Sequence, residues 1–499
     1  MKMWKWLLVS GACAAAMVTA GAQQPAELII RNGLVVNADG RTFGDLRIRG
    51  EQVAEIGTNL TAGPGAREID AKGMILLPGA IDTHTHLNAE PSGAPRPNAN
   101  TDDYVSGSSA GLAGGATTLS NFIPMQDGET PAAYGERVKH AIGKSGITDF
   151  FIHVNMGNDP SKFGPSLYNQ LADLGFVSTG EDFLARAGFD QNAVAWHKAF
   201  RDAGPAGFLS MLHAEDWSIM AEAQERLMAE GKGSIHNFSQ SAPAIAEVIA
   251  VQRAVGIAEA FGVPIYILHM SSGRALQVAE DAMKRGLQIY VETRPMYLHL
   301  TAEVYQRPDA GLYLGGPPLR DKWDQDKLWE GIAKGTVHTI GTDHSGYAKA
   351  AKLDPTQTLV NKRMGLANLQ EYLPMMFSEG VMKERITLEQ FVAVTSTNAS
   401  KLFGLYPKKG LIKVGSDADI AIWDPAMKKA IKDEDMFSNA KYSTYAGMQI
   451  TGWPKMTIRR GEVVFDNGKI VGKPGSGKFV PGKRFSGPVL RARGNWLDN

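Results

Sequence analysis

The pattern of hydrophobic and polar residues changes twice along the chain. Residues 27–77 alternate apolar and polar positions in short runs that Asn-Gly, Arg-Gly and Lys-Gly pairs separate. The same pattern returns near the other end, in residues 418–425 and 453–472. Both ends of the chain are therefore predicted to form short β-strands joined by tight turns.

The middle of the chain has a different pattern of hydrophobic residues. Apolar strand-like runs alternate there with longer helical periodicities, such as residues 242–262 and 274–286. This alternation is typical of a (β/α)8 barrel, the TIM barrel. We therefore predict an α/β fold. It consists of a TIM barrel in residues 78–404, a small β-sandwich built from residues 23–77 and 405–480, and a C-terminal tail in residues 481–499.

The first residues have the pattern of a secretory signal peptide. Lys2 and Lys5 precede an apolar run over residues 6–18, and a small-residue cleavage site follows at Ala22. The run is shorter than the ~20 residues of a membrane helix, and no later segment is apolar enough for one. We predict a signal peptide in residues 1–22 and an exported, periplasmic protein. Lipidation at Cys13 ranks second, because little apolar sequence precedes it.

Composition narrows the possible functions. The chain has 499 residues, 52 Lys and Arg against 52 Asp and Glu, 43% hydrophobic residues and one cysteine. Zero net charge argues against nucleic-acid binding, a single cysteine excludes a disulfide scaffold, and the hydrophobic content argues against disorder. A small-molecule partner is the remaining expectation.

Metal-ligand residue types recur where apolar runs end. His84 and His86 close one run at alternate positions, which point to the same side of a strand. The carboxyl ends of barrel strands meet on one face, so ligands from separate strands can converge there. Nitrogen and oxygen donors of this kind suit one or two divalent metals of the zinc type. The predicted ligands are His84, His86, Glu181, His213, His269 and Asp343.

Specific motifs in the chain resemble the hydantoinase/dihydropyrimidinase branch of the amidohydrolase superfamily. The resemblance covers residues 27–475, through "PGAIDTHTHL", "HAED", "PIYILHMSS", "YVETRPMYL", "GGPPLRDK", "GTDH" and "STNASKLFGLYPKKGLIKVGSDADIAIWDP". It implies a TIM barrel with a β-sandwich, hydrolysis of cyclic amides with two metals, usually zinc, and a dimer or tetramer. By motif match, His84, His86 and Asp343 would bind the more buried metal. His213 and His269 would bind the second.

The residue that bridges the two metals differs from the family pattern. The family uses a carboxylated lysine, whereas the matching stretch "STGEDFLAR" contains none. Aligning Phe183 with a family phenylalanine places Glu181 at the lysine position, and its carboxylate could take the same role. Counting back from His213 without a gap places Gly180 there instead, and Asp182 is a lesser candidate.

Three substrate-facing positions also depart from the family. Arg186 replaces a tyrosine; it could stabilise an oxyanion, bind a substrate carboxylate, or be a solvated surface residue. Gly316 and Met364 stand where the family has a serine and an asparagine that recognise the ring amide. Losing those polar contacts predicts an altered substrate preference.

The sequence therefore predicts a metal-dependent amidohydrolase that acts on a non-peptide C–N bond. Asp343 would accept a proton from the attacking water and return it to the leaving nitrogen. Two alternatives remain. One is a hydrolase of linear N-acyl amino acids or dipeptide-like substrates, with Arg186 on their carboxylate. The other is a non-catalytic hydantoinase-like binding protein, against which the retained ligand set argues.

Overall fold

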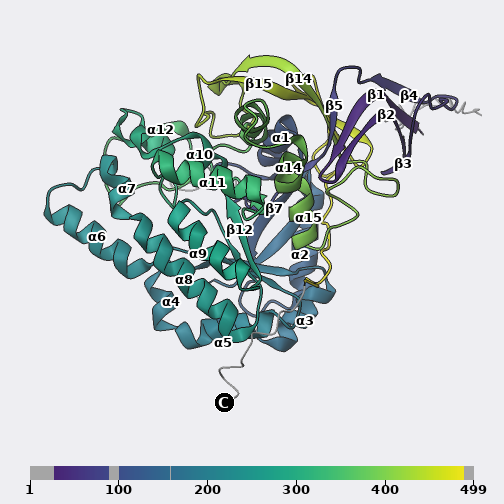
Figure 1. Cartoon of the computed structure of the whole chain (residues 1–499). Helices are drawn as coiled ribbons and strands as arrows, with labels where there is room; N and C mark the ends of the chain where they lie inside the picture. Colours follow the sequence, from purple (N-terminus) through teal and green to yellow (C-terminus); the bar gives the residue numbers. More distant parts are fainter. Residues whose placement is uncertain (1–26, 89–99, 158, 488–499) are drawn as a thin grey trace, which may run out of the picture.

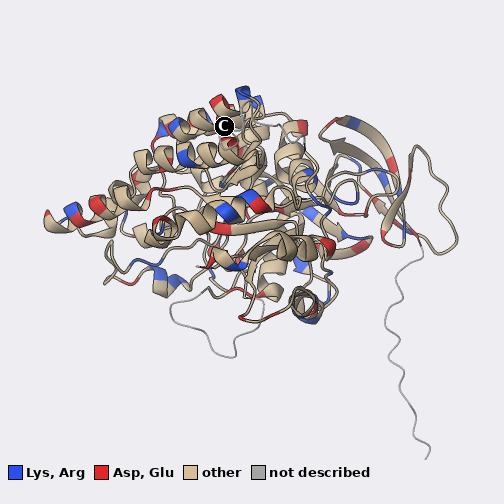
Figure 2. Cartoon of the chain, turned by 90° about the horizontal axis from the view of Figure 1, so that it is seen from below, with Lys and Arg blue, Asp and Glu red and all other residues tan. Residues whose placement is uncertain are grey.

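The computed structural model describes residues 27–88, 100–157 and 159–487, and these form a barrel with an attached sheet (Figure 1). Residues 1–22, with Cys13, lie outside the described residues, so the signal peptide stays a prediction. Within the described chain, no helix is long and apolar enough to cross a membrane. Basic and acidic residues are interspersed along the visible elements (Figure 2).

Eight parallel strands form the barrel wall in sequential order from β6 to β13. An isolated bridge between Thr85 and His344 joins the regions that follow the first and last strands, so the sheet nearly closes. The strands are β6 (Ala80–Asp82), β7 (Ala116–Pro124), β8 (Asp149–Asn155), β9 (Ser178–Phe183), β10 (Leu209–His213), β11 (Ile265–Ile267), β12 (Ile289–Thr293) and β13 (Thr339–Ile340). The predicted fold class is confirmed.

Helices surround this wall (Figure 1). The longer ones are α1 (Tyr104–Gly114), α2 (Pro131–Ser145), α3 (Pro165–Asp173), α5 (Ala193–Ala203), α6 (Trp217–Ala229), α8 (Ala244–Phe261), α9 (Gly273–Lys284) and α11 (Lys322–Lys334). The short ones include α4 (Ala187–Gln191), α7 (Phe238–Ser241), α10 (Pro295–His299), α12 (Lys349–Lys352), α13 (Tyr372–Met376), α14 (Leu388–Val392) and α15 (Asn398–Leu402).

Local sequence explains where these helices begin and end. The Ser272 side chain accepts hydrogen bonds from the backbone of Arg274 and Ala275 and so caps α9. Gly262 ends α8 with a φ of 64°, a left-handed conformation that costs glycine little. These two caps explain the start of α9 and the end of α8.

Both ends of the chain build the second sheet, which has nine strands (Figure 1). The N-terminal strands are β1 (Glu27–Asn37), β2 (Gly40–Arg49), β3 (Gln52–Gly57), β4 (Arg67–Asp70) and β5 (Ile75–Pro78). The C-terminal strands are β14 (Ile420–Ala430), β15 (Gln449–Arg459), β16 (Glu462–Asp466) and β17 (Lys469–Ile470). The two sets join where β5 pairs antiparallel with β14. Their apolar side chains, including Ile30, Leu46, Ile420 and Ile458, share one core.

The segment after β17 runs back to the barrel. The backbone N–H groups of Val480, Gly482 and Phe485 donate to the carbonyls of Phe150, Gly175 and Gly207 in turn. The side chain of Val480 packs with Phe151 and Phe403. Residues 480–485 therefore contact the barrel wall, although the predicted division of the chain placed them at the end of the sandwich and the start of the tail.

A buried cluster of charges holds the two parts together. The Nζ atom of Lys409 lies 2.8 Å from Asp149 at the start of β8, 3.1 Å from Asp417 and 2.6 Å from Asp419. Arg460 adds a second cation, 3.0 Å from Asp149. Although burial disfavours its charge, the surrounding carboxylates raise the pKa of Lys409. The ammonium group thus occupies the space among three carboxylates that could otherwise suggest a metal site.

Candidate metal centre

The six predicted ligands come together at the carboxyl end of the barrel strands. His84 and His86 follow β6, Glu181 lies in β9 and His213 ends β10. His269 follows β11, and Asp343 follows β13. They form two groups of three, and within each group the ligand atoms lie within 4.8 Å of one another.

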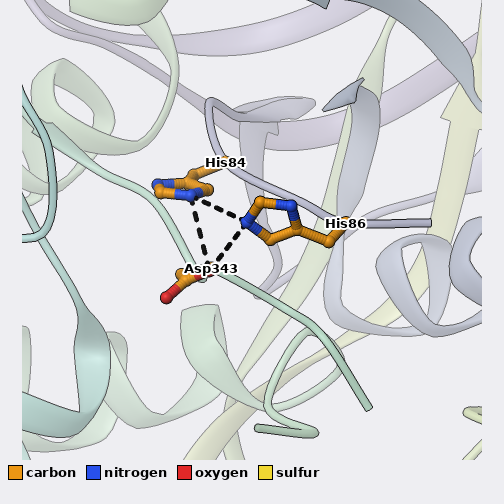
Figure 3. A group of neighbouring side chains, drawn as sticks. All are labelled: His84, His86 and Asp343. Carbon is orange, nitrogen blue, oxygen red and sulfur yellow. Dashed lines mark hydrogen bonds and ion pairs between the residues drawn. The ribbon is translucent and has the colours of Figure 1, made fainter. Parts of the chain in front are cut away.

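The first group consists of His84, His86 and Asp343 (Figure 3). The Nε2 atoms of the two histidines are 3.1 Å apart. Asp343 Oδ1 lies 3.4 Å from His84 Nε2 and 3.0 Å from His86 Nε2. Ligand atoms about 2.1 Å from a tetrahedral metal are about 3.4 Å apart, so this spacing fits a zinc-type ion.

The second group is centred on Glu181. Its Oε1 atom lies 2.9 Å from His213 Nδ1 and 3.0 Å from His269 Nε2. Its other oxygen lies 3.7 Å from His86 Nε2, in the first group. Asp182 instead accepts a hydrogen bond from Thr179 at 3.1 Å. Of the three candidates for the bridging position, Glu181 alone places a carboxylate between the two groups.

Two further carboxylates orient the histidine rings, and sequence reasoning missed them. Glu292 Oε1 lies 2.9 Å from His84 Nδ1, and Glu215 Oε2 lies 2.8 Å from His213 Nε2. These contacts leave His84 Nε2 and His213 Nδ1 facing the groups, as in the carboxylate–histidine–metal arrangement. Glu292 lies in β12, whose carboxyl end opens on the same face, and that signal could have found it.

Arg294 is the third residue that the sequence did not reveal. Its guanidinium is fully buried and lies 2.9 Å from Asp343 Oδ2. It also donates to the carbonyl of Gly316 at 3.2 Å and contacts the Tyr297 hydroxyl at 3.4 Å. Asp343 is therefore held from both sides, by the histidines through one oxygen and by Arg294 through the other.

Backbone strain marks two of the ligands. His269 has a φ of 35° and Asp343 a φ of 50°, both in the left-handed region that non-glycine residues seldom adopt. Each such residue costs about 1–3 kcal/mol, which the surrounding structure must offset. Strain of this kind is concentrated at functional sites.

Electrostatics at the site favour cations. Burial raises the pKa of the Glu181 carboxyl, but the hydrogen bonds to His213 and His269 outweigh it and hold the pKa well below its usual range. Burial lowers the pKa of His213, yet Glu181 and Glu215 raise it to about 10. The carboxylates thus stay ionised and bind positive charge, which divalent metals can supply in place of protons.

A pocket of about 560 Å³ opens beside the second group. His213, Glu215, Arg186, Gly316 and Met364 all line it. A Cβ atom at Gly316 would lie 3.1 Å from Met364 Cε and 3.7 Å from His213 Cε1. The structure therefore brings the three predicted substrate-facing positions next to the candidate metal centre.

Arg186 lies in the pocket wall and not among the ligands. Its guanidinium carbon lies 3.8 Å from the centre of the Phe183 ring, which in turn stacks on His213. One aromatic ring therefore separates Arg186 from the nearest ligand. The structure does not bring Arg186 into the cluster, and its catalytic role stays a prediction.

Comparisons with known proteins identify the family. Residues 320–464 match the Amidohydrolase family. The chain is 34% identical over 467 residues to a D-hydantoinase from Ralstonia pickettii, across 92% of this chain and 99% of that protein. The chain belongs to the hydantoinase/dihydropyrimidinase branch of the amidohydrolase superfamily.

Solved structures of this branch have the same architecture. A dihydropyrimidinase from Brevibacillus agri superposes with a TM-score of 0.82 at 31% identity, covering 93% of this chain and all of that one. An L-hydantoinase from Arthrobacter aurescens gives a TM-score of 0.81 at 29% identity, over 91% of this chain and 99% of that one. The predicted family and the predicted class, a metal-dependent hydrolase of cyclic amides, are confirmed.

Proposed function

We propose that this hydantoinase relative hydrolyses a C–N bond in a cyclic amide with two divalent metal ions, for which zinc is our expectation. His84, His86 and Asp343 would hold one ion, and Glu181, His213 and His269 the other. The observation that carries the proposal is the position of Glu181, whose two oxygens face the two groups of ligands. When bound, such ions polarise a carbonyl group and lower the pKa of water.

The chain's own residues would orient the reaction. Asp343 would take a proton from the attacking water and deliver it to the leaving nitrogen. General acid–base catalysis requires a group at the reacting centre that performs both transfers. Arg294 would hold the Asp343 carboxylate in place, and Glu292 and Glu215 would fix the rings of His84 and His213. The ligand set also supports catalysis over a purely binding role.

The substrate panel that tests this proposal contains hydantoins, dihydrouracil, cyclic imides and N-acyl amino acids, each assayed with added Zn²⁺. We expect metal-dependent hydrolysis of ring substrates, with a preference unlike a hydantoinase's because Gly316 and Met364 offer no polar side chain to the ring amide. Activity confined to unsubstituted hydantoins would contradict that interpretation. Activity confined to N-acyl amino acids would favour the linear-substrate alternative.

Two further proposals concern the protein in the cell. The pattern of residues 1–22 supports an exported, periplasmic protein. The mass of the mature chain tests this, since cleavage after Ala22 leaves Gln23 at the N-terminus and lipidation would leave Cys13. Family membership supports a dimer or tetramer, which light scattering on the purified protein measures.

A further inference from the structure

Within the described part of the chain, two cations of the pocket, Arg186 and Lys362, have no carboxylate partner. Both line the pocket beside the candidate metal centre. Among the described residues, no carboxylate oxygen forms an ion pair with the nitrogen atoms of either side chain. Arg226 and Arg320, by contrast, are paired with Glu222 and Glu247.

Arg186 borders the metal centre on one side. Its guanidinium lies over one face of Phe183, and the ring centres of Phe183 and His213 are 4.8 Å apart. The stacking holds the arginine in place but does not use its five N–H donors. Those donors remain available to an oxygen-bearing group in the pocket.

Lys362 reaches the same region from the segment before Met364. Its Nζ atom donates to the Leu359 carbonyl at 2.5 Å, lies 3.5 Å from Gln224 Oε1 and sits 5.5 Å from the centre of the Phe238 ring. Burial lowers the pKa of Lys362, while the nearby Glu215 favours its charged form. Lys362 and Glu215 line the same pocket, and Glu215 is hydrogen-bonded to His213 of the metal centre.

The rest of the lining is largely apolar. Trp217, Met220 and Met228 face the pocket from α6, at the spacing of one helix face. Phe238 and Met364 add to this surface. Arg186 is exposed, whereas Lys362 is partly buried and loses hydration beside these apolar walls. An anionic ligand would replace the hydration that Lys362 loses.

We propose that the substrate carries a carboxylate near the ring to be opened, and that Lys362, together with Arg186, binds it. The proposal rests on the proposed function, because it concerns the substrate of that same site. Arg186 is stacked on Phe183, which is stacked on His213, and Lys362 lines the same pocket as His213. The carboxylate would therefore be attached to the ring directly or through a short linker, while apolar parts of the substrate contact α6.

Matched ring compounds test the proposal. One pair is hydantoin-5-acetate and 5-isobutylhydantoin, and the other is dihydrouracil-6-carboxylate and 6-isopropyl-dihydrouracil. Within each pair the shapes are similar and only one member is charged. For the metal-loaded enzyme, we expect a higher kcat/KM for the charged member. A hydrogen bond to a charged group predicts that Lys362→Met lowers the charged-to-neutral ratio roughly tenfold or more, mainly through KM.

Lys139→Met is the matched control, since it removes one positive charge from an exposed residue of α2 that pairs with Glu136. This variant should leave the ratio as it is in the wild type. A second measurement needs no variant, because added salt should raise KM for the charged compounds more than for the neutral ones. Preference for the neutral member, with the same ratio in Lys362→Met and no differential salt effect, would overturn the proposal.

Calorimetric binding of the same pairs to the metal-loaded protein separates this proposal from the proposed function. If no amide is hydrolysed in any metal-dependent assay, the proposed function fails. Tighter binding of the charged compounds, weakened by Lys362→Met, would still support the carboxylate site. Equal binding of both members by both proteins would overturn it.

Discussion

The buried guanidinium of Arg294 lies 2.9 Å from Asp343 Oδ2, the carboxylate oxygen that faces away from His84 and His86. Asp343 is the residue that we expect to transfer protons, and its backbone has a left-handed φ of 50°. Burial raises the pKa of its carboxyl, but Arg294 and His84 lower it well below the usual range. Arg294 therefore contributes both to the orientation and to the negative charge of the proposed proton carrier.

We expect Arg294→Met to lower kcat about 10–100-fold with a smaller change in KM, because outer partners of metal ligands have effects of this size. Arg294→Lys keeps the charge but not the planar fork, so it should recover only part of the loss. Steady-state kinetics of both variants, with their metal content, checks this. Wild-type kcat in Arg294→Met would show that Asp343 does not need the contact.

Glu181 is expected to be required for full metal loading. Glu181→Gln removes the negative charge between the two ligand groups, so the purified protein should retain about one equivalent of metal where the wild type holds about two. Elemental analysis after gel filtration measures this. Asp182→Asn is the matched control, because the Asp182 side chain bonds to Thr179 and does not lie between the ligand groups. Burial also raises the pKa of its carboxyl well above the usual range. Equal metal content in Glu181→Gln and wild type would contradict the bridging position.

Metal affinity should increase with pH. In chelator-treated protein, burial lowers the pKa of His213, but Glu181 and Glu215 raise it to about 10. Burial also lowers the pKa of His84, but the carboxylates of Asp343 and Glu292 raise it to about 9. At neutral pH both rings then carry a proton that the metal must displace, so affinity should rise by about one to two powers of ten per pH unit. Competition with a chromophoric chelator at pH 6, 7 and 8 measures the slope. A zero slope, after correction for the chelator's own protonation, would show that these rings are neutral without metal.

The cluster around Lys409 should dominate the attachment of the sheet to the barrel. Lys409→Met leaves Asp149, Asp417 and Asp419 buried without their shared cation, and breaking a buried ion pair in this way costs about 3–5 kcal/mol. Lys408→Met is the control, since Lys408 is 55% exposed and exposed pairs contribute about 0–1 kcal/mol. Chemical denaturation of the two variants should show a large loss only for Lys409. Similar unfolding midpoints would contradict this role.

The sequence predicted the ligands because each one follows an apolar run, and in a barrel the carboxyl ends of such runs meet. His213 and His269 could be placed in this way although 56 positions separate them in the chain. Glu181 could be identified only to within one residue. The alignment left Gly180 and Asp182 as alternatives for the bridging position. The tertiary contact with His86 distinguishes Glu181 from both of them.

Other features have no signal in the local sequence. Arg294 follows a strand, but an arginine is not a metal ligand and so does not belong to the pattern that predicted the site. Its contact with Asp343 exists only once the barrel closes. Lys409 similarly depends on carboxylates from β8 and from the loop before β14. The contacts of residues 480–485 with the barrel are largely backbone hydrogen bonds, which leave no trace in side-chain composition.

The most direct test of metal-dependent hydrolysis is turnover of one verified ring substrate before chelation, after chelation and after Zn²⁺ is restored. The measurement is made on the wild type and on Asp343→Asn in parallel, with metal content determined at each step. We expect wild-type activity to disappear with the metal and return with about two equivalents, whereas Asp343→Asn rebinds metal and stays about 10²–10⁴-fold slower. Full activity in chelated, metal-free protein, or wild-type turnover by Asp343→Asn, would contradict the account.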